Sequence, residues 1–157
     1  KVVRQPVDVI RMVERCRRGV IIPDHVRVYV HHQLDDPIAE LDEDQMLQVL
    51  TNLIVNAVEA MPQGGDLTIA TRGTPDEVII EVRDTGTGIP PANLPKIFEP
   101  FFTTKQLGKG TGLGLAVAYG IVKMHRGRIE VVSNADPARG PTGTTFTVAL
   151  PRVDREA

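Results

Sequence analysis

The chain has 157 residues, of which 41% are hydrophobic and 24% are charged, and its formal net charge is −2 at pH 7. This length predicts one domain with its own core, and this charge balance gives no reason to expect a nucleic-acid or membrane partner. The single cysteine, Cys16, excludes an internal disulfide and a cysteine-based zinc site. No apolar run approaches the roughly 18–20 residues of a membrane span. Because the chain begins at Lys1 rather than Met, we expect a fragment of a larger protein.

The first forty residues predict one helix and one strand. Residues 6–18 carry apolar residues at helical spacing, with a proline in the first turn and a glycine after the last. Cys16 falls on the apolar side of that helix, which predicts a core position. Residues 26–30 alternate as a half-buried strand does.

A second helix contains two asparagines in an otherwise apolar stretch. Asp42 with Gln45 three residues later forms a capping-box pattern, and the helix that it opens is expected to end near Met61. Asn52 and Asn56 lie one turn apart on the same side of that helix. Because a buried amide costs stability unless it is hydrogen-bonded, this pair needs hydrogen-bond partners, and a bound ligand is one way to supply them.

The rest of the chain predicts two strands of an antiparallel hairpin, an irregular stretch, a third helix and two further strands. These segments are residues 67–71, 77–83, 84–111, 112–125, 128–132 and 144–150. Their order favours an α+β fold: a two-layer α/β sandwich with one mixed, mostly antiparallel sheet and helices on one face. A parallel βαβ nucleotide fold is the alternative, but neither of its glycine signatures is present.

The first of two glycine-rich candidate sites follows a predicted strand directly. In this segment, Gly86 and Gly88 permit a tight backbone path and close approach of a flat ligand, and Asp84 can accept a hydrogen bond from an exocyclic amine. The alternative is a simple turn that Asp84 caps, because aspartate and glycine are common in turns.

The second glycine-rich segment, residues 108–115, leads straight into the third helix. Alternate glycines expose successive backbone N–H groups, and a helix N-terminus adds partial positive charge, so this segment suits phosphates. Lys105 and Lys109 add positive charge nearby. A flexible glycine linker is the alternative.

Three phenylalanines lie between the two glycine segments. We expect Phe98, Phe101 and Phe102 to pack against the core and to hold the base of a moving loop, or simply to form a satellite hydrophobic cluster. The histidines show neither zinc-site spacing nor a catalytic-triad motif, and each is expected to be structural. They are His25, His31, His32 and His125.

Four motifs therefore stand in order along the chain. They are Asn52-Leu-Ile-Val-Asn56-Ala, Asp84-x-Gly86-x-Gly88, Phe98-Glu-Pro-Phe101-Phe102 and Gly110-Thr-Gly112-Leu-Gly114-Leu. Together they closely resemble the N, G1, F and G2 boxes of the catalytic ATP-binding domain of sensor histidine kinases. Those domains share the Bergerat fold with gyrase, heat-shock chaperone and mismatch-repair ATPases. The resemblance covers about residues 7–151, and residues 99–105 look most like kinases with PAS sensory domains, including the nitrogen-regulatory type.

The resemblance implies a site for ATP or ADP with Mg²⁺. Asn56 would coordinate Mg²⁺ through its amide oxygen, and Asn52 would line the pocket near the phosphates. Asp84 would contact adenine N6, with Gly88 leaving room for the ring and Thr144 supporting the adenine contact. Residues 101–111 would form the ATP lid. The other expected binding residues are Gly86, Ile89, Phe102, Thr103, Lys105, Lys109, Gly110, Thr111, Gly112, Leu113, Gly114 and Leu115.

One position departs from the resemblance. Many related kinases place a basic residue three positions after the magnesium asparagine, where this chain has Glu59. Either Lys105 or Lys109 takes over that role, or phosphate binding is weaker. We therefore count Lys105 with Asn52 and Asn56 as the expected catalytic residues.

The resemblance implies the catalytic domain of a two-component sensor histidine kinase. Such a domain donates the γ-phosphoryl group of ATP to a histidine on a separate dimerisation domain, with a response regulator as an indirect partner. An ATP hydrolase of the gyrase or chaperone type is one alternative, but those enzymes have a glutamate at the position of Asn52. A non-catalytic nucleotide-sensing module and an anti-sigma-type serine kinase are the others.

The same reasoning gives an expected organisation. Residues 1–157 form a single catalytic domain, with a core at about residues 7–151 and a polar tail at residues 152–157. We expect the domain to be cytoplasmic and monomeric in isolation, without contact to nucleic acid or membrane, and to come from a homodimeric parent. None of its histidines lies in the phosphoacceptor context of the family, so it is not expected to phosphorylate itself.

Overall fold

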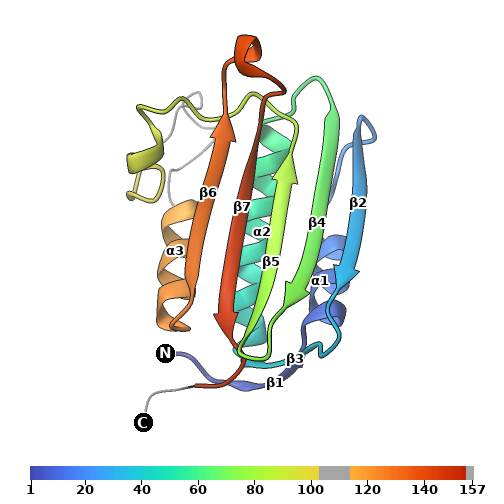
Figure 1. Ribbon diagram of the computed structural model, residues 1–157, viewed down its shortest axis with the longest axis vertical. Helices are drawn as coiled ribbons and strands as arrows, with labels where there is room; N and C mark the ends of the chain where they lie inside the picture. The colour runs from blue at the N-terminus through green and yellow to red at the C-terminus, as the bar shows by residue number, and fades with distance from the viewer. Residues whose placement is uncertain (103–113, 155–157) are drawn as a thin grey trace.

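The computed structural model describes residues 1–102 and 114–154 (Figure 1). Within these ranges the helices are α1 Val9–Gly19, α2 Glu43–Glu59 and α3 Gly114–Met124, with short 3₁₀ turns η1 Leu94–Lys96 and η2 Pro137–Arg139. The strands are β1 Gln5–Asp8, β2 Val26–Gln33, β3 Ile38–Leu41, β4 Gly65–Gly73, β5 Glu77–Asp84, β6 Arg128–Asn134 and β7 Gly143–Pro151.

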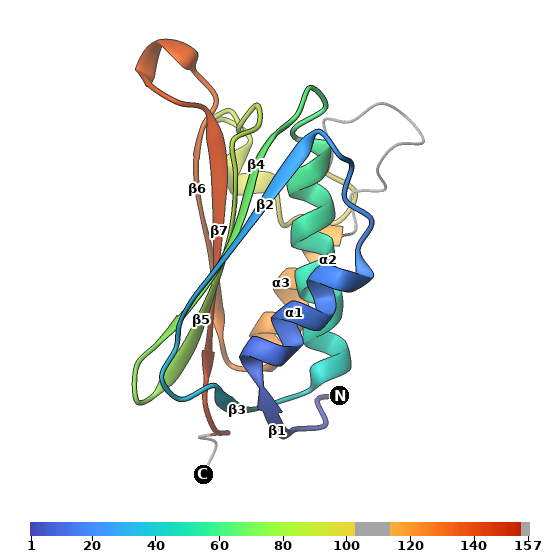
Figure 2. The same ribbon diagram turned by 90° about the vertical axis from the view of Figure 1, so that its right-hand side faces the viewer.

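The main sheet has five strands in the order β2-β4-β5-β7-β6. β2 and β4 run parallel, and the other neighbouring pairs are antiparallel. α1, α2 and α3 all lie on one face of this sheet, and the opposite face carries no helix of the described chain (Figure 2). The expected α+β sandwich is confirmed, and a fully parallel nucleotide-binding sheet is excluded.

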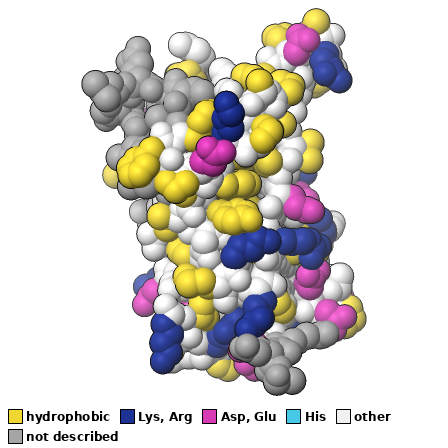
Figure 3. Space-filling view, turned by 90° about the vertical axis from the view of Figure 1, so that its left-hand side faces the viewer, with side chains coloured by type: hydrophobic (Ala, Val, Ile, Leu, Met, Phe, Trp, Pro, Cys, Tyr) yellow, Lys and Arg dark blue, Asp and Glu magenta, His cyan; other side chains and the backbone are white. Residues whose placement is uncertain are grey.

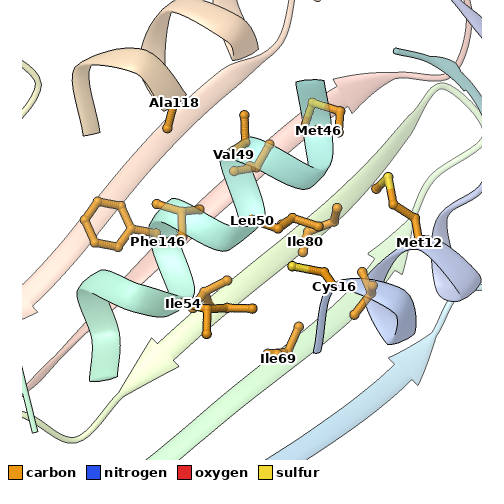
Figure 4. Packing of buried hydrophobic residues seen from close by; sticks show 14 of the residues in the cluster. Met12, Cys16, Met46, Val49, Leu50, Ile54, Ile69, Ile80, Ala118 and Phe146 are labelled. Atoms are coloured by element: carbon orange, nitrogen blue, oxygen red, sulfur yellow. The ribbon is translucent and has the colours of Figure 1, made fainter. Parts of the chain in front are cut away.

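The core lies between α2 and the helix-facing side of the sheet (Figure 4). Ile69, Ile80 and Phe146 of the sheet are almost fully buried beneath the helix. Burial of each such side chain contributes roughly 1.5–3 kcal/mol. The buried residues of α2 itself are Met46, Val49, Leu50, Leu53, Ile54 and Ala57. This packing fixes α2 along the sheet and thereby positions its two asparagines.

The second helix begins at the predicted cap, but only half of the capping box forms. The Asp42 side chain accepts a hydrogen bond from Gln45 N–H at 3.2 Å. Gln45 does not return the bond; its side-chain amide donates instead to Lys1 O at 3.3 Å. The Asp42 N–H donates to His125 Nε2 at 3.1 Å, so a residue far along the chain takes the place of the expected glutamine.

The first helix starts later than predicted, which corrects the range 6–18. Asp8 is the N-cap, because its side chain accepts a hydrogen bond from Arg11 N–H at 3.1 Å. Pro6 lies in β1, which pairs antiparallel with β3 to form a separate two-stranded sheet. Both of these short strands were absent from the prediction. Cys16 is buried, as expected, with its thiol 3.6 Å from Thr51 Oγ1.

The side of the molecule that carries α3 and β6 exposes several apolar side chains (Figure 3). They are Val117, Tyr119 and Met124 of α3 and Val132 of β6. On its inner face, α3 buries Ala118, Ile121 and Val122. α3 therefore exposes apolar side chains beside the buried residues that face the core. Within the described ranges, none of the helices has the length and apolar character that crossing a bilayer requires.

Candidate functional site

The helix-facing side of the sheet becomes polar at one end. Asp84, Thr144 and Ser133 are partners in the neighbouring strands β5, β7 and β6. The preceding row is apolar and contains Val82 and Phe146. Asp84 and Thr144 are each only 4% exposed. Because buried polar groups need partners, this polar row marks a place where the sheet holds hydrogen-bonding groups instead of core side chains.

Asp84 is held by backbone donors. Its carboxylate accepts a hydrogen bond from Gly86 N–H at 2.8 Å, and the backbone of Thr144, its partner in β7, also favours the charged form of the carboxylate. Burial raises the pKa of Asp84, and the backbone groups of Gly86 and Thr144 partly offset that rise. The carboxylate oxygens therefore have a fixed direction and remain able to accept from a ligand.

The loop after β5 is anchored to α2, β4 and β6. The three hydrogen bonds are Thr87 N–H to Ala60 O at 3.1 Å, Asp66 N–H to Thr85 Oγ1 at 3.0 Å, and Ile89 N–H to Ser133 Oγ at 2.7 Å. Residues 85–89 are thus held across the C-terminal end of α2, beside the polar row. This brings the first predicted glycine segment next to the predicted asparagine helix.

The two glycines of this loop are required by the protein's own backbone. A Cβ atom on Gly86 would lie 2.3 Å from Ala60 O, and one on Gly88 would lie 2.1 Å from Asn134 O. Gly88 also has a φ of 78°, in the left-handed region. The sequence interpretation gave these glycines a tight backbone path and the close approach of a ligand, and the structure supplies the backbone reason for each.

Ser133 is the member of the polar row that the sequence analysis missed. The predicted strand ended at residue 132, whereas β6 continues to Asn134 and so includes Ser133. Ile129 and Val131 share the helix-facing side of β6, and the same alternation extends to Ser133. A hydroxyl following two apolar residues at period two was the signal that could have revealed it.

The two asparagines of α2 have different surroundings. The Asn52 amide Nδ2 donates to Gly114 O at 3.0 Å, which ties α2 to the first residue of α3. Asn56 is half-buried, and no residue of the described chain is a hydrogen-bond partner of its side chain. Asn56 therefore has a free amide oxygen, and Asn52 has a defined structural contact.

The aromatic segment follows the prediction only in part. Phe98 and Phe102 pack against the core, and the Phe98 ring centroid lies 5.1 Å from that of Tyr119 and 6.3 Å from that of Phe146. Phe101 is 73% exposed, with a φ of 69°. The prediction that all three phenylalanines pack against the core is wrong for Phe101, because the chain turns through the left-handed region there and leaves the ring in solvent.

The second glycine segment is described only at its end. Gly114 begins α3, and Leu115, the next residue, is half-buried and packs against the core. The remaining predicted binding residues lie outside the described residues, as does most of the expected lid. They are Thr103, Lys105, Lys109, Gly110, Thr111, Gly112 and Leu113.

Residues 41–154 match the family described as histidine kinase-, DNA gyrase B-, and HSP90-like ATPase. The chain belongs to this family. Sensor kinase CckA of Brucella abortus is 43% identical over 151 residues, which cover 87% of this chain and 15% of that protein. Sporulation kinase C of Bacillus subtilis is 44% identical over 110 residues, covering 70% of this chain and 24% of that protein. The chain thus spans only a small part of the length of these two relatives.

Solved structures agree with this family assignment. The catalytic domain of histidine kinase ThkA superposes with a TM-score of 0.79 and 26% identity, covering 96% of this chain and 99% of that chain. A mycobacterial sensor histidine kinase, MprB, gives a TM-score of 0.78 and 29% identity, covering 95% and 97%. As a member of this ATPase family, the chain is a nucleotide-binding domain.

The residues present fit a nucleotide of this ATPase family. Asp84 offers a buried acceptor for a base, and Asn56 offers an amide oxygen of the kind that Mg²⁺ prefers. Among the described residues, no group of three or more His, Cys, Asp or Glu side chains could hold a metal ion. A cation at Asn56 would therefore take its other ligands from the nucleotide phosphates and from water.

Proposed function

We propose that this chain is the catalytic domain of a two-component sensor histidine kinase. It binds Mg·ATP and donates the γ-phosphoryl group to a histidine on a separate dimerisation domain. The observation that carries the proposal is the buried Asp84 carboxylate at the end of β5, held by the Gly86 N–H. The loop that contains Gly86 is hydrogen-bonded to Ala60 O at the end of α2, the helix of Asn52 and Asn56. The matching relatives are sensor and sporulation kinases by name, which supports the same conclusion.

Each residue has a distinct role in binding. Asp84 accepts a hydrogen bond from the exocyclic amine of adenine, and Thr144 lies beside it in the next strand. The Asn56 amide oxygen is the protein ligand to Mg²⁺. Mg²⁺, when bound with ATP, neutralises phosphate charge and orients the terminal phosphates. Lys105 and Lys109 add positive charge in place of a basic residue at position 59.

Asn52 separates this proposal from an ATP hydrolase. An amide cannot take a proton from water, and the Asn52 Nδ2 already donates to Gly114 O. Water near the γ-phosphate therefore lacks a general base at this position. The phosphoryl group is kept for a protein acceptor, for which positioning and charge neutralisation are the main requirements.

The partner is a histidine-bearing helical dimerisation domain of the same kinase, which makes the parent a homodimer that passes phosphate to a response regulator. The exposed apolar side chains of α3, which are Val117, Tyr119 and Met124, support contact with another protein surface on this side of the molecule (Figure 3). This helix starts at Gly114, which Asn52 holds, so a partner on α3 would lie close to the expected phosphate end of the site.

A phosphotransfer assay tests the proposal. The purified chain is mixed with a candidate histidine-bearing helical domain, Mg²⁺ and γ-labelled ATP. Acid-labile label on the partner is the expected result, and steady phosphate release without label would favour the hydrolase. Asn56→Ala should abolish Mg²⁺-dependent ATP binding in calorimetry, whereas Val55→Ala, at an exposed position of the same helix, should not. Unchanged binding in Asn56→Ala would exclude the metal assignment.

A further inference from the structure

The hydroxyl of Ser133 makes three close polar contacts. It accepts a hydrogen bond from Ile89 N–H at 2.7 Å and donates to Gly143 O at 2.9 Å. Its oxygen also lies 2.8 Å from Thr144 Oγ1. Ser133 therefore connects the loop after β5, the β6–β7 hairpin and the buried hydroxyl beside Asp84.

The direction of the Ser133–Thr144 hydrogen bond follows from counting protons. A serine hydroxyl has one proton and two lone pairs. Gly143 O can only accept, so it takes the Ser133 proton, and the Ile89 N–H occupies one lone pair. The remaining lone pair of Ser133 then accepts the proton of Thr144. The Thr144 hydroxyl thus donates its only proton to Ser133 and has none left to donate to a ligand.

The Thr144 hydroxyl and the Asp84 carboxylate are therefore both acceptors. Thr144 Oγ1 keeps only lone pairs for a ligand, and the ionised Asp84 carboxylate has no proton to donate. An exocyclic amine can donate to this pair. A carbonyl oxygen in the same place would face oxygen lone pairs without a donor, which is costly in a buried site.

We propose that Ser133 is a positioning residue that fixes the Thr144 hydroxyl as an acceptor, so that the site selects purine nucleotides with a 6-amino group over those with a 6-oxo group. This inference rests on the proposed function, because it assumes that the base lies against Asp84 and Thr144. A site that hydrogen-bonds a particular substrate group discriminates strongly against an analogue without that group. Ser133 controls this choice without touching the base.

The test compares ATP with ITP, which carries a 6-oxo group, in calorimetric titrations with Mg²⁺. Ser133→Ala frees the Thr144 proton to donate to a ligand, and the ratio of ATP affinity to ITP affinity should fall by about two- to tenfold. Ser133→Thr, which keeps the hydroxyl, should restore the ratio. Thr145→Ala is the matched control, because residue 145 points to the opposite face of β7, and it should leave the ratio unchanged.

A second variant tests the same proton directly. Thr144→Val keeps the side-chain shape and removes the hydroxyl, so it should lower the ratio even if Ser133→Ala fails to fold. Adding Ser133→Ala to Thr144→Val should then have no further effect on the ratio. The inference is overturned if wild-type protein binds ATP but folded Ser133→Ala keeps the wild-type ratio. If wild-type protein binds neither nucleotide, the proposed function falls together with the inference.

Discussion

His125 Nε2 accepts the backbone N–H of Asp42 at 3.1 Å, which joins the residue after α3 to the N-cap of α2. The other ring nitrogen, Nδ1, lies 2.9 Å from Ile121 O and carries the proton of a neutral ring. Asp42 also accepts a hydrogen bond from Val3 N–H at 3.0 Å. A single histidine thus connects two helices to the entering chain.

This contact predicts a pH-dependent stability. Burial lowers the pKa of His125 below its ordinary value of 6.5, because the charged ring is poorly solvated. Below that value the unfolded chain binds a proton that the folded chain does not, so stability is full above pH 6.5 and is lost as the pH falls. Urea unfolding between roughly pH 5 and pH 7.5 measures the slope.

Two variants, His125→Gln and His31→Gln, test whether His125 causes this pH dependence of stability. His125→Gln should lose about 1–3 kcal/mol at neutral pH and should flatten the dependence on pH below neutrality. His31→Gln, at an exposed position, should keep the wild-type slope. A wild-type slope in His125→Gln would show that another group causes the pH dependence.

A lysine in the expected lid should contribute more to the binding of ATP than to the binding of ADP. Lys105 lies outside the described residues, so this prediction rests on the sequence. If Lys105 contacts the γ-phosphate, Lys105→Ala should weaken ATP binding about tenfold and ADP binding much less. Lys96→Ala, an exposed lysine of η1, is the control. Equal weakening for both nucleotides would exclude a γ-phosphate role.

Local patterns in the sequence were enough for the larger elements. The apolar run of β5 and the Asp42 cap predicted a strand and a helix start that the structure has, because each depends on neighbours in the chain. The motif residues Asp84 and Thr144, which were predicted to share one site, also lie side by side in the structure. Their positions follow from one antiparallel register, in which they are partners.

Features that depend on distant contacts were not predictable in the same way. Pro6 pairs with Glu40 across the small sheet, and no local pattern marks either strand. The packing reason for Gly86 lies at Ala60 O, in another element. Ser133 gains its role only when β6 is placed beside β7. In each case the cause is a contact between segments, which single-sequence patterns do not contain.

Arg152 should be one of the most important residues near the C-terminus, although it falls in the segment expected to be a polar tail. Its side chain is only 12% exposed. Nε donates to Thr74 O at 2.8 Å, and Nη1 donates to Asp36 O at 2.7 Å and Ile38 O at 2.9 Å. Arg152→Ala should therefore cost about 2–3 kcal/mol in chemical unfolding.

Two comparisons test whether geometry or charge stabilises this contact. Arg152→Lys should recover little of the lost stability, because an ammonium group cannot reproduce the forked guanidinium. Arg139→Ala, an exposed arginine of η2, should change stability by less than about 0.5 kcal/mol. Full recovery in Arg152→Lys would mean that charge alone is sufficient.

The glycines of the loop after β5 should be intolerant of alanine even without nucleotide. An added Cβ on Gly86 would lie 2.3 Å from Ala60 O, and one on Gly88 would lie 2.1 Å from Asn134 O, both rigid backbone atoms. Each substitution should cost about 1–3 kcal/mol, with Gly88→Ala the worse because its φ is positive. Thermal unfolding of the nucleotide-free protein measures this directly.

Gly120 gives the opposite expectation and is the matched control. It lies inside α3, and an added Cβ there would have no heavy atom within 4 Å. Gly120→Ala should therefore raise stability by about 0.5–1 kcal/mol, because alanine loses less backbone entropy in a helix. If Gly86→Ala were as stable as wild type without nucleotide but bound ATP poorly, the glycine would serve the ligand rather than the fold. Loss of stability without nucleotide would instead show that Gly86 is needed for the fold itself, through its close packing against Ala60 O at the end of α2.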